Sequence, residues 1–422
     1  MRLAVVGSGI AGLACAHILG PNHEVVLYEA RNRLGGHSNT VVVDDPNLGP
    51  TGIDTGFIVH NDRNYPNLLR LFDELGVETV DSEMSFAVHD PEADFYYRAT
   101  NLNTLFAQRR RLVDPSMWMM LADIVRFHRS GRRMLREVDE GENRWDDLTI
   151  GDLLDQGRYR ADFVDRHLIP MGAAVWSTPP GRFRDFPAIS LLRFLDNHGL
   201  LSIGDRPQWR TVAGGSRHYV SAIEQRFSGS IRRDRPVLAV TPSDCGVDVV
   251  DEGGRERFDQ VILACHSDQS LEMVADSSPE LAELLAAIRY QPNRATLHTD
   301  VGVLPPRPRS WAAWNYRIDR AASASTVTYD LTRLMRLATD VRYLVTLNDP
   351  NRIDDDHIIR QIDYAHPVLD HAATAAQTRI RERNGSDWIW LCGAWMGYGF
   401  HEDGMRSAVD VCRGLGVDWG HE

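Results

Sequence analysis

The first thirty residues pass from a strand-like hydrophobic pattern to a helix-like one and back again. A β-branched run over residues 2–6 ends at a glycine, small and apolar residues recur at helical spacing over 10–20, and another apolar run covers 23–28. This order predicts a strand, a tight turn, a helix and a second strand, which is the opening unit of a parallel sheet covered by helices. The chain is therefore expected to have an α/β fold.

The predicted turn carries glycines in the pattern GxGxxG. The first glycine permits the turn, the second admits a pyrophosphate, and the third lets the helix approach the strand, so that the helix N-terminus faces the phosphates. An acidic residue ends the second strand, where its carboxylate can accept both ribose hydroxyls of an adenosine and opposes a 2′-phosphate. The sequence thus predicts a dinucleotide site that disfavours NADP, formed by Gly7, Gly9, Ile10, Ala11, Gly12 and Glu29.

Apolar periodicity continues along the chain. A helix is predicted over residues 218–227 and strands over 235–240 and 258–265, the last of them apolar enough for burial on both faces. Near the C-terminus a strand, a glycine loop and a helix recur, with Asp403 as the expected helix cap. These segments extend the α/β pattern to both ends of the chain.

Composition and charge narrow the function classes. The 422 residues are 43% hydrophobic and 25% charged, which is typical of a globular protein of about two or three domains. Acidic residues outnumber basic ones by 59 to 46, so general affinity for nucleic acid is not expected. All 46 basic residues are Arg, and this excludes a Schiff-base lysine and a Walker P-loop.

Cysteine usage and the missing motifs indicate the compartment. Five Cys form no CxxC pair, which favours a reduced, cytoplasmic protein. Neither a signal peptide nor a spanning helix is evident, and His and acidic residues show no metal-ligand spacing. We therefore predict no metal.

Several segments together resemble one family. Glu29-Ala-Arg-Asn-Arg-Leu-Gly-Gly-His37, Thr51–Phe57, and the stretches 211–265 and 387–416 are similar to the flavin-containing amine oxidase and phytoene desaturase superfamily. Within it, they look most like a bacterial branch of FAD oxidoreductases associated with cyclopropane (modified) fatty acid synthesis. The resemblance implies a discontinuous, Rossmann-like FAD-binding domain and an α+β substrate domain with a mixed sheet and helices. The implied ranges are 1–57, 206–269 and 381–422 for the first, and 58–205 and 270–380 for the second.

The resemblance also implies non-covalent FAD. Arg33, Gly35 and Gly36 would follow the pyrophosphate and ribityl chain, although a pair of solvated arginines at Arg31 and Arg33 is an alternative. The amides of Gly404 and Met405 would face the N1 and C2-carbonyl edge of the flavin. The other cofactor positions that it implies are Ala30, Arg31, His37, Gly56, Phe57, Val237, Ala264, Gly393, Ala394 and Asp403.

The implied activity is hydride abstraction by FAD from a small or apolar substrate, including desaturation of a modified acyl chain. One alternative is a flavin amine oxidase acting on a primary or secondary amine. Amine oxidases commonly hold a water with a Lys, and the chain has none to supply. A second alternative is a flavoprotein with mainly structural FAD that binds a partner enzyme or a membrane surface.

Few side chains qualify for roles around a flavin. His401, Tyr398 and His198 are the catalytic candidates, since imidazole can move a proton near neutral pH. A structural hydrogen bond for His401 and a helix-end position for His198 are the alternatives. An apolar substrate pocket, or simply a core, would be built by Trp176, Trp209, Trp311, Trp314 and Phe400.

One segment is strongly cationic. Residues 109–137 contain eight Arg against three acidic residues, and a helical pattern runs from Asp114-Pro115 to about Asp139. One side of this helix carries Arg126, Arg129, Arg133 and Arg136. This side could meet an anionic membrane surface and make the protein peripheral to a membrane, or it could be a solvated helix face.

Overall fold

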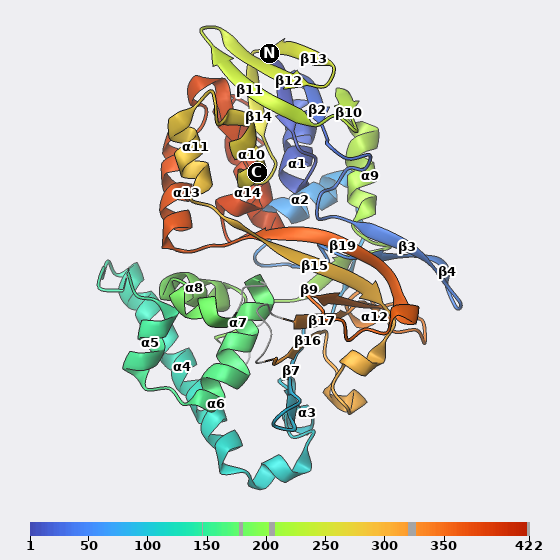
Figure 1. Ribbon diagram of the computed structural model, residues 1–422, viewed down its shortest axis with the longest axis vertical. Coiled ribbons are helices and arrows are strands. Elements are labelled where there is room, and N and C mark those ends of the chain that lie inside the picture. Colours follow the sequence, from blue (N-terminus) through green and yellow to red (C-terminus); the bar gives the residue numbers. More distant parts are fainter. Residues whose placement is uncertain (146, 177–179, 202–206, 320–325, 420–422) are drawn as a thin grey trace.

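The computed structural model describes residues 1–145, 147–176, 180–201, 207–319 and 326–419 (Figure 1). They form two tiers, an upper tier around a parallel sheet and a lower tier of a mixed sheet and helices, with both chain ends in the upper tier (Figure 1). The domain boundary predicted between residues 205 and 206 lies outside the described residues. The α/β fold class expected from the sequence is confirmed.

A five-stranded parallel sheet forms the centre of the upper tier, in the order β10-β2-β1-β14-β20. Its middle strands read as continuous apolar runs because both of their faces are covered. Leu3 and Val5 point to one face, and Ala4 and Val6 to the other. The strands are β1 (Arg2–Val6), β2 (Glu24–Tyr28), β10 (Ser230–Arg232), β14 (Gln260–Leu263) and β20 (Ile389–Leu391).

Helices cover the first face of this sheet. Here α1 packs beside α14, the last helix of the chain, so the two ends of the sequence share one core. These helices are α1 (Ile10–Leu19), α2 (Pro66–Leu75), α9 (Arg217–Arg226) and α14 (His401–Gly414).

The other face is covered by an antiparallel sheet and three helices. The expected strand over 235–240 belongs to this small sheet and not to the parallel one. The three helices fall mostly in residues 270–380, which the sequence assigns to the substrate domain, but Val274, Leu285 and Ile380 complete this upper core. The elements are β11 (Val237–Ser243), β12 (Gly246–Asp251), β13 (Gly254–Phe258), α10 (Ser267–Val274), α11 (Pro279–Ala286) and α13 (His371–Arg383).

A seven-stranded mixed sheet lies below, in the order β19-β15-β18-β17-β16-β7-β8. The long strands β15 and β19 run between the tiers (Figure 1). Its strands are β7 (Phe86–Asp90), β8 (Phe95–Arg98), β15 (Tyr290–His298), β16 (Trp314–Arg317), β17 (Thr326–Asp330), β18 (Leu344–Leu347) and β19 (Ile358–Pro367), with α12 (Leu331–Leu334) after β17. Smaller pairings join β3 (Thr40–Asp45) to β4 (Gly49–Asp54), and β9 (Trp209–Val212) to β5 (His60–Asn61) and β6 (Thr79–Asp81).

Helices fill the rest of the lower tier. The predicted helix after Asp114 is confirmed as α4, which begins at Pro115, ends at Asp139 and is capped by the Asp114 carboxylate, 3.0 Å from the amide of Ser116. Its buried side carries Met117, Met120, Phe127 and Met134. The helices are α3 (Leu102–Leu105), α4 (Pro115–Asp139), α5 (Ile150–Gly157), α6 (Ala161–Phe163), α7 (Ile169–Trp176) and α8 (Ala188–Asn197).

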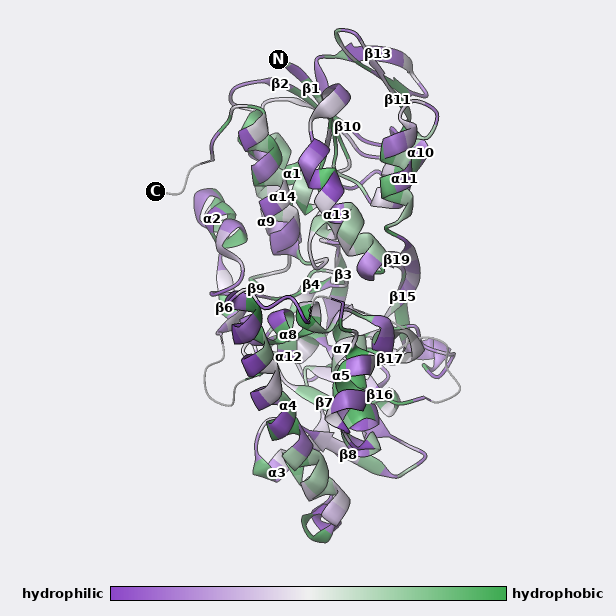
Figure 2. Cartoon of the chain, turned by 90° about the vertical axis from the view of Figure 1, so that its left-hand side faces the viewer, coloured by the Kyte–Doolittle hydropathy of each residue, from purple (hydrophilic) through white to green (hydrophobic). Residues whose placement is uncertain are grey.

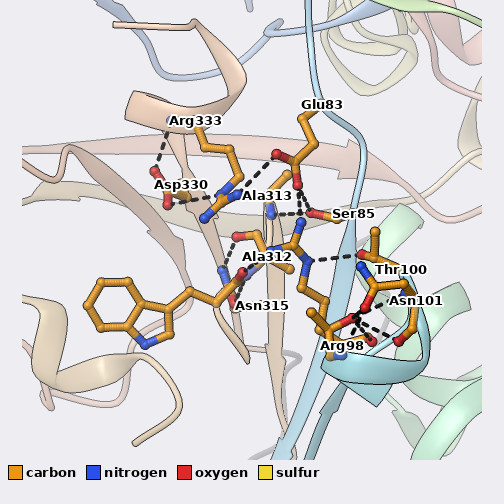
Figure 3. Close-up of polar contacts among 12 residues, drawn as sticks. Glu83, Ser85, Arg98, Thr100, Asn101, Ala312, Ala313, Asn315, Asp330 and Arg333 are labelled. Atoms are coloured by element: carbon orange, nitrogen blue, oxygen red, sulfur yellow. Dashed lines mark hydrogen bonds and ion pairs between the residues drawn. The ribbon is translucent and has the colours of Figure 1, made fainter. Parts of the chain in front are cut away.

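An ion-pair network joins several strand ends of the mixed sheet (Figure 3). Glu83 accepts hydrogen bonds from Ser85 at 2.8 Å and from Arg333 at 3.0 Å, and it also pairs with Arg98 of β8. Asp330, fully buried at the end of β17, accepts a hydrogen bond from the Arg333 amide at 3.0 Å. Because each charge faces an opposite one and is hydrogen-bonded, the network holds β7, β8 and α12 together despite its removal from water.

Buried imidazoles make the fold sensitive to acid. Burial lowers the pKa of His167 to about 3, and its Nδ1 lies 2.9 Å from the Tyr97 hydroxyl. Because the unfolded chain binds a proton near pH 6.5 and the folded one does not, this group makes the protein less stable as the pH falls below 6.5. From pH 6.5 to 4 the loss is about 3 kcal/mol.

We therefore expect His167→Gln to flatten the dependence of unfolding free energy on pH between 6.5 and 4, as measured by urea denaturation. His371→Gln, at an exposed position on α13, is the matched control and should leave the slope unchanged. Equal slopes for wild type and His167→Gln would contradict the assignment.

Candidate cofactor and substrate site

The glycine turn after β1 is tightly packed except at its middle glycine. Gly7 has a φ of 99° and donates its amide to the Tyr28 carbonyl at 2.8 Å. A Cβ at Gly12 would lie 1.9 Å from the Gly7 carbonyl oxygen, and one at Gly9 would meet nothing within 4 Å. The loop is thus closed toward the sheet and open at Gly9, as expected where a pyrophosphate approaches.

Glu29 lies beside this loop. Its carboxylate accepts hydrogen bonds from the amide and hydroxyl of Ser8 at 3.1 and 2.5 Å, and from the Arg31 amide at 2.9 Å. The Glu29 carbonyl accepts the Arg235 amide at 3.0 Å, which brings the start of β11, with Val237, to the same end of β2. These positions fit the adenosine end of a dinucleotide.

The segment after β2 folds back over the glycine turn. Gly35, with a φ of 110°, donates its amide to the Ser8 carbonyl at 2.9 Å, and a Cβ at Gly36 would lie 3.0 Å from the Cα of Gly9. Arg33 is half-buried and donates to the Gly36 carbonyl at 2.8 Å, whereas Ala30 and Arg31 are exposed. The alternative interpretation of Arg31 and Arg33 as solvated charges therefore does not fit Arg33, but it does fit the exposed Arg31.

The start of α14 differs from the expectation. Phe400, not Asp403, is the N-cap, and the Asp403 carboxylate reaches back to the amides of Tyr398 and Phe400, both at 3.0 Å. Because the helix begins at His401, the Gly404 amide already donates to the Phe400 carbonyl at 3.2 Å. The first-turn amides that the helix leaves without a partner are therefore those of residues 401–403, and the role of the Gly404 and Met405 amides toward a flavin stays a prediction.

Small residues let α14 meet α1. A Cβ at Gly404 would lie 2.7 Å from the Cγ2 of Ile10 and 3.6 Å from the amide nitrogen of Ala394. Gly393 donates its amide to the Ser407 hydroxyl at 2.9 Å. On the other side of the glycine turn, the Ala264 amide donates to the Val6 carbonyl at 2.8 Å. The N-termini of α1 and α14 thus open onto one region.

The loop from β4 brings two more predicted residues here. The Phe57 amide donates to the His37 carbonyl at 2.9 Å, and a Cβ at Gly56 would lie 2.2 Å from that oxygen. The Phe57 ring stacks on His401 with centroids 3.7 Å apart. Residues 35–38, 56–57 and 401 therefore form one wall.

His401 makes its polar contacts within this wall. Its Nε2 lies 2.9 Å from the Ser38 hydroxyl and 3.3 Å from the Tyr219 hydroxyl. Burial lowers its pKa to about 3, so the imidazole is neutral near pH 7. This geometry favours the structural hydrogen bond over proton transfer, and a catalytic role for His401 stays a prediction.

An aromatic cluster adjoins Phe400. The Phe194 ring lies 4.7 Å from Trp176 and 5.1 Å from Phe400, and His198 lies 4.0 Å from Phe194 and 5.9 Å from Trp209. Three of the five aromatics predicted for the substrate pocket, Trp176, Trp209 and Phe400, thus gather here. The other two pack elsewhere: Trp311 donates its indole N–H to the Pro305 carbonyl at 2.8 Å, and Trp314 packs on Tyr329.

The remaining catalytic candidates are held by backbone contacts. His198 is the C-cap of α8, its Nδ1 lies 2.8 Å from the Phe194 carbonyl, and burial lowers its pKa to about 4. These contacts match the helix-end alternative. The Tyr398 carbonyl lies 3.3 Å from the Trp176 indole nitrogen, and burial raises the pKa of its phenol.

Two carboxylates follow Phe400, and both point into the protein. Glu402 accepts the amides of Asn67 and Leu68 at 3.1 and 3.0 Å and the Asn67 side chain at 2.5 Å, at the N-terminus of α2. Asp403 pairs with Arg406 besides its backbone contacts. The link that Glu402 makes between α14 and α2 has no local signal in the sequence, because its partners Asn67 and Leu68 lie far from it in the chain.

Buried polar atoms indicate what kind of group this region would take. Within the described ranges, His37 Nε2 and both ring nitrogens of His60 are buried without a hydrogen-bond partner. Such atoms call for a polar partner. Together with the open backbone at Gly9, the Glu29 carboxylate and the two helix N-termini, they fit a dinucleotide with a polar ring system such as FAD.

Comparisons with known proteins bear on this fit. A family model described as flavin-containing amine oxidoreductase matches residues 10–299. A 15-cis-phytoene desaturase of Synechococcus elongatus is 39% identical over 79 residues, which are 18% of this chain and only 16% of that protein.

Solved structures share the fold over nearly the whole chain. A redesigned putrescine oxidase superposes with a TM-score of 0.71 at 15% identity, covering 98% of both chains. A conjugated-linoleic-acid-producing (CLA-producing) fatty acid isomerase from P. acnes superposes with a TM-score of 0.68 at 15% identity, again over 98% of both chains.

No described helix is long and apolar enough to cross a membrane.

The family match spans more than half of the chain, and it confirms the predicted superfamily and flavin cofactor. The chain therefore belongs to the flavin-containing amine oxidoreductase family.

Proposed function

We propose that the protein removes hydride from a small or apolar substrate, with dehydrogenation of a modified acyl chain as the leading case. The observation that carries this proposal is the aromatic cluster of Trp176, Phe194 and Phe400 beside the N-terminus of α14. Aromatic walls suit apolar substrates, since they bury carbon surface and leave no polar group unpaired.

Charge around this cluster supports the same substrate class. Glu402 and Asp403 are both engaged by inward hydrogen bonds, so neither faces an ammonium group. The neutral His401 adds no charge. A carbon chain would therefore meet a surface that offers it no competing polar site.

Bound FAD would supply the redox chemistry by accepting the hydride, and the chain's own residues hold the reactants. Glu29 would hold the adenosine ribose, and residues 35–37 and 56–57 would lie along the rest of the non-covalent cofactor. Phe57 stacks on His401, which is hydrogen-bonded to Ser38, and the two rings form a stiff wall that limits where a substrate carbon can lie.

Names of similar proteins agree with an apolar substrate. The fatty acid isomerase and the phytoene desaturase both act, by their names, on long hydrocarbon compounds. The likeness of the sequence to the branch associated with cyclopropane fatty acid synthesis is part of this proposal and makes a modified acyl chain the substrate to try first.

An amine oxidase is the alternative, and one observation favours it. Trp176, Phe194 and Phe400 form a cluster of aromatic rings, and a cation can lie against such rings as well as a hydrocarbon can. The putrescine oxidase that shares the fold acts on an amine by its name.

Anaerobic titration of the purified holoprotein separates the two activities. We expect fatty acids and phospholipids carrying cyclopropane or methyl branches to bleach the visible absorbance of the oxidised flavin, because the flavin accepts the hydride. Putrescine and monoamines should leave it unchanged. Bleaching by amines alone would establish the alternative instead, and bleaching by no compound of either class would favour a mainly structural FAD.

The aromatic cluster gives a second test. Phe400→Leu should lower kcat/KM for an acyl substrate about 3- to 10-fold, because the ring contact with Phe194 is worth about 0.5–1.5 kcal/mol. Phe227→Leu is a matched control, since Phe227 is also half-buried and caps a helix end, on α9. Equal kinetic effects from both changes would show that the cluster has no special role.

The predicted contact of Glu29 with the cofactor gives a third test, which measures FAD binding. Glu29→Gln removes the charge from the predicted ribose contact and should raise the Kd of the apoprotein for FAD about 10- to 100-fold, as expected for a hydrogen bond to a charged group. Glu24→Gln, at the other end of the same strand, should not change it. Flavin fluorescence quenching measures both, and an unchanged Kd for Glu29→Gln would place the ribose elsewhere.

A further inference from the structure

Exposed apolar side chains gather at the lower end of the molecule. Of the thirteen large hydrophobic residues that are exposed in the described chain, five fall within residues 102–119, a segment that we name the tip. It consists of α3, the 3₁₀ turn Arg109–Val113 and the first turn of α4 (Figure 1). The five are Leu102, Leu112, Val113, Trp118 and Met119, with exposed fractions of 72, 46, 85, 49 and 41%.

The tip is a firmly built part of the fold. Asn101 and Thr104 cap α3 reciprocally, and Asp114 caps α4. Phe106, Met117 and Met120 are buried beneath it in the lower core. These caps and anchors hold the five exposed side chains outward, so the folded protein does not cover them itself.

Trp118 is the most informative of the five. Its ring packs on Phe106 with centroids 5.2 Å apart, and its indole N–H donates to the Leu112 carbonyl at 2.9 Å. About half of the side chain stays exposed. A tryptophan whose polar atom is satisfied and whose ring edge is open is typical of residues at a membrane interface.

The charge of the tip is opposite to that of the whole protein. The chain has a formal net charge of −13, whereas residues 102–119 contain three Arg and a single acidic residue. Asp114, that residue, pairs with Arg111. Arg109 and Arg110 are exposed next to the apolar side chains, where Arg109 donates to the Asn103 side chain and Arg110 pairs with Asp94.

Not all of the arginines predicted on one side of α4 (Arg126, Arg129, Arg133 and Arg136) are free to meet a membrane. Arg126 donates to the carbonyls of Gly157 and Arg158 and lies 4.2 Å from the Tyr159 ring centroid, so it ties α4 to α5. Arg129 and Arg136 are exposed higher on α4. These arginines therefore extend the charged surface beside the tip, and they are not the centre of the proposed membrane-binding surface.

We propose that the tip docks the protein on an anionic lipid bilayer. The five apolar side chains would enter the boundary between headgroups and acyl chains, and Arg109 and Arg110 would lie at the lipid phosphates. Apolar side chains, a half-exposed tryptophan and flanking arginines together match this environment better than the surface of another protein, because each finds its own layer of the bilayer.

Docking at the tip would place the lower tier against the membrane. The tip shares one apolar cluster with Trp176, Phe194 and, at its edge, Phe400. The lower helices carry both hydrophobic and hydrophilic stretches down to the end of the molecule (Figure 2). The inference does not depend on the proposed substrate, since membrane binding is measured without turnover.

Vesicle flotation of the holoprotein tests the proposal. We expect binding to vesicles of phosphatidylcholine mixed with phosphatidylglycerol, weaker binding to phosphatidylcholine alone, and loss of binding at high salt. The triple variant Leu102→Gln, Val113→Gln, Met119→Gln should bind about tenfold more weakly or worse. Arg109→Gln with Arg110→Gln should weaken binding to the anionic vesicles only.

The matched control is a triple variant at exposed apolar positions away from the tip, Val42→Gln, Leu48→Gln, Ile359→Gln. It should bind like wild type, and flavin absorbance and thermal unfolding would verify that every variant is folded. Failure of the wild type to float with anionic vesicles would overturn the proposal, as would equal losses in both triple variants. The proposal would also be overturned if the wild type formed a dimer that the tip variant dissociates, because the tip would then be an interface between two copies of the chain.

Discussion

The contact between Ile10 and Gly404 is the constraint on which the rest of the site depends. A side chain at residue 404 would place its Cβ 2.7 Å from Ile10, so only glycine lets α14 lie against α1 at this distance. The contact brings two helix N-termini, one from each end of the chain, to one place. Since a helix N-terminus attracts negative charge, their convergence makes an anion-binding region from backbone alone. In a protein without lysine, this supply of positive potential needs no titratable side chain.

Local patterns predicted the framework well. The GxGxxG turn, the acidic end of β2 and the long helix after Asp114 are each encoded by residues close together in the sequence, so each could be predicted without knowledge of distant contacts. The start of α14 was missed because its N-cap is Phe400, a poor capping residue, and the capping contact comes from Asp403 three positions later. A search for Ser, Thr, Asp or Asn at the cap could only select the wrong residue.

Contacts between distant segments explain the other differences. Ser38, Tyr219 and His401 meet across more than 180 positions in the sequence, and no periodicity encodes such a meeting. The aromatics were expected to share one pocket on composition alone, and only the fold separates Trp311 and Trp314 from Trp176, Trp209 and Phe400. Helices α10, α11 and α13 joined the upper core because their apolar faces fit the back of the parallel sheet.

The order of the parallel sheet has a consequence for biosynthesis. Strand β14, which pairs with β1, follows it only after some two hundred and fifty intervening residues, and β20 and α14 are made later still. Until α14 has been made, the apolar surface of α1 that it covers stays exposed, and until β20 has been made, β14 is an unpaired edge strand. The nascent chain must therefore avoid aggregation through these apolar surfaces until α14 and β20 have been made.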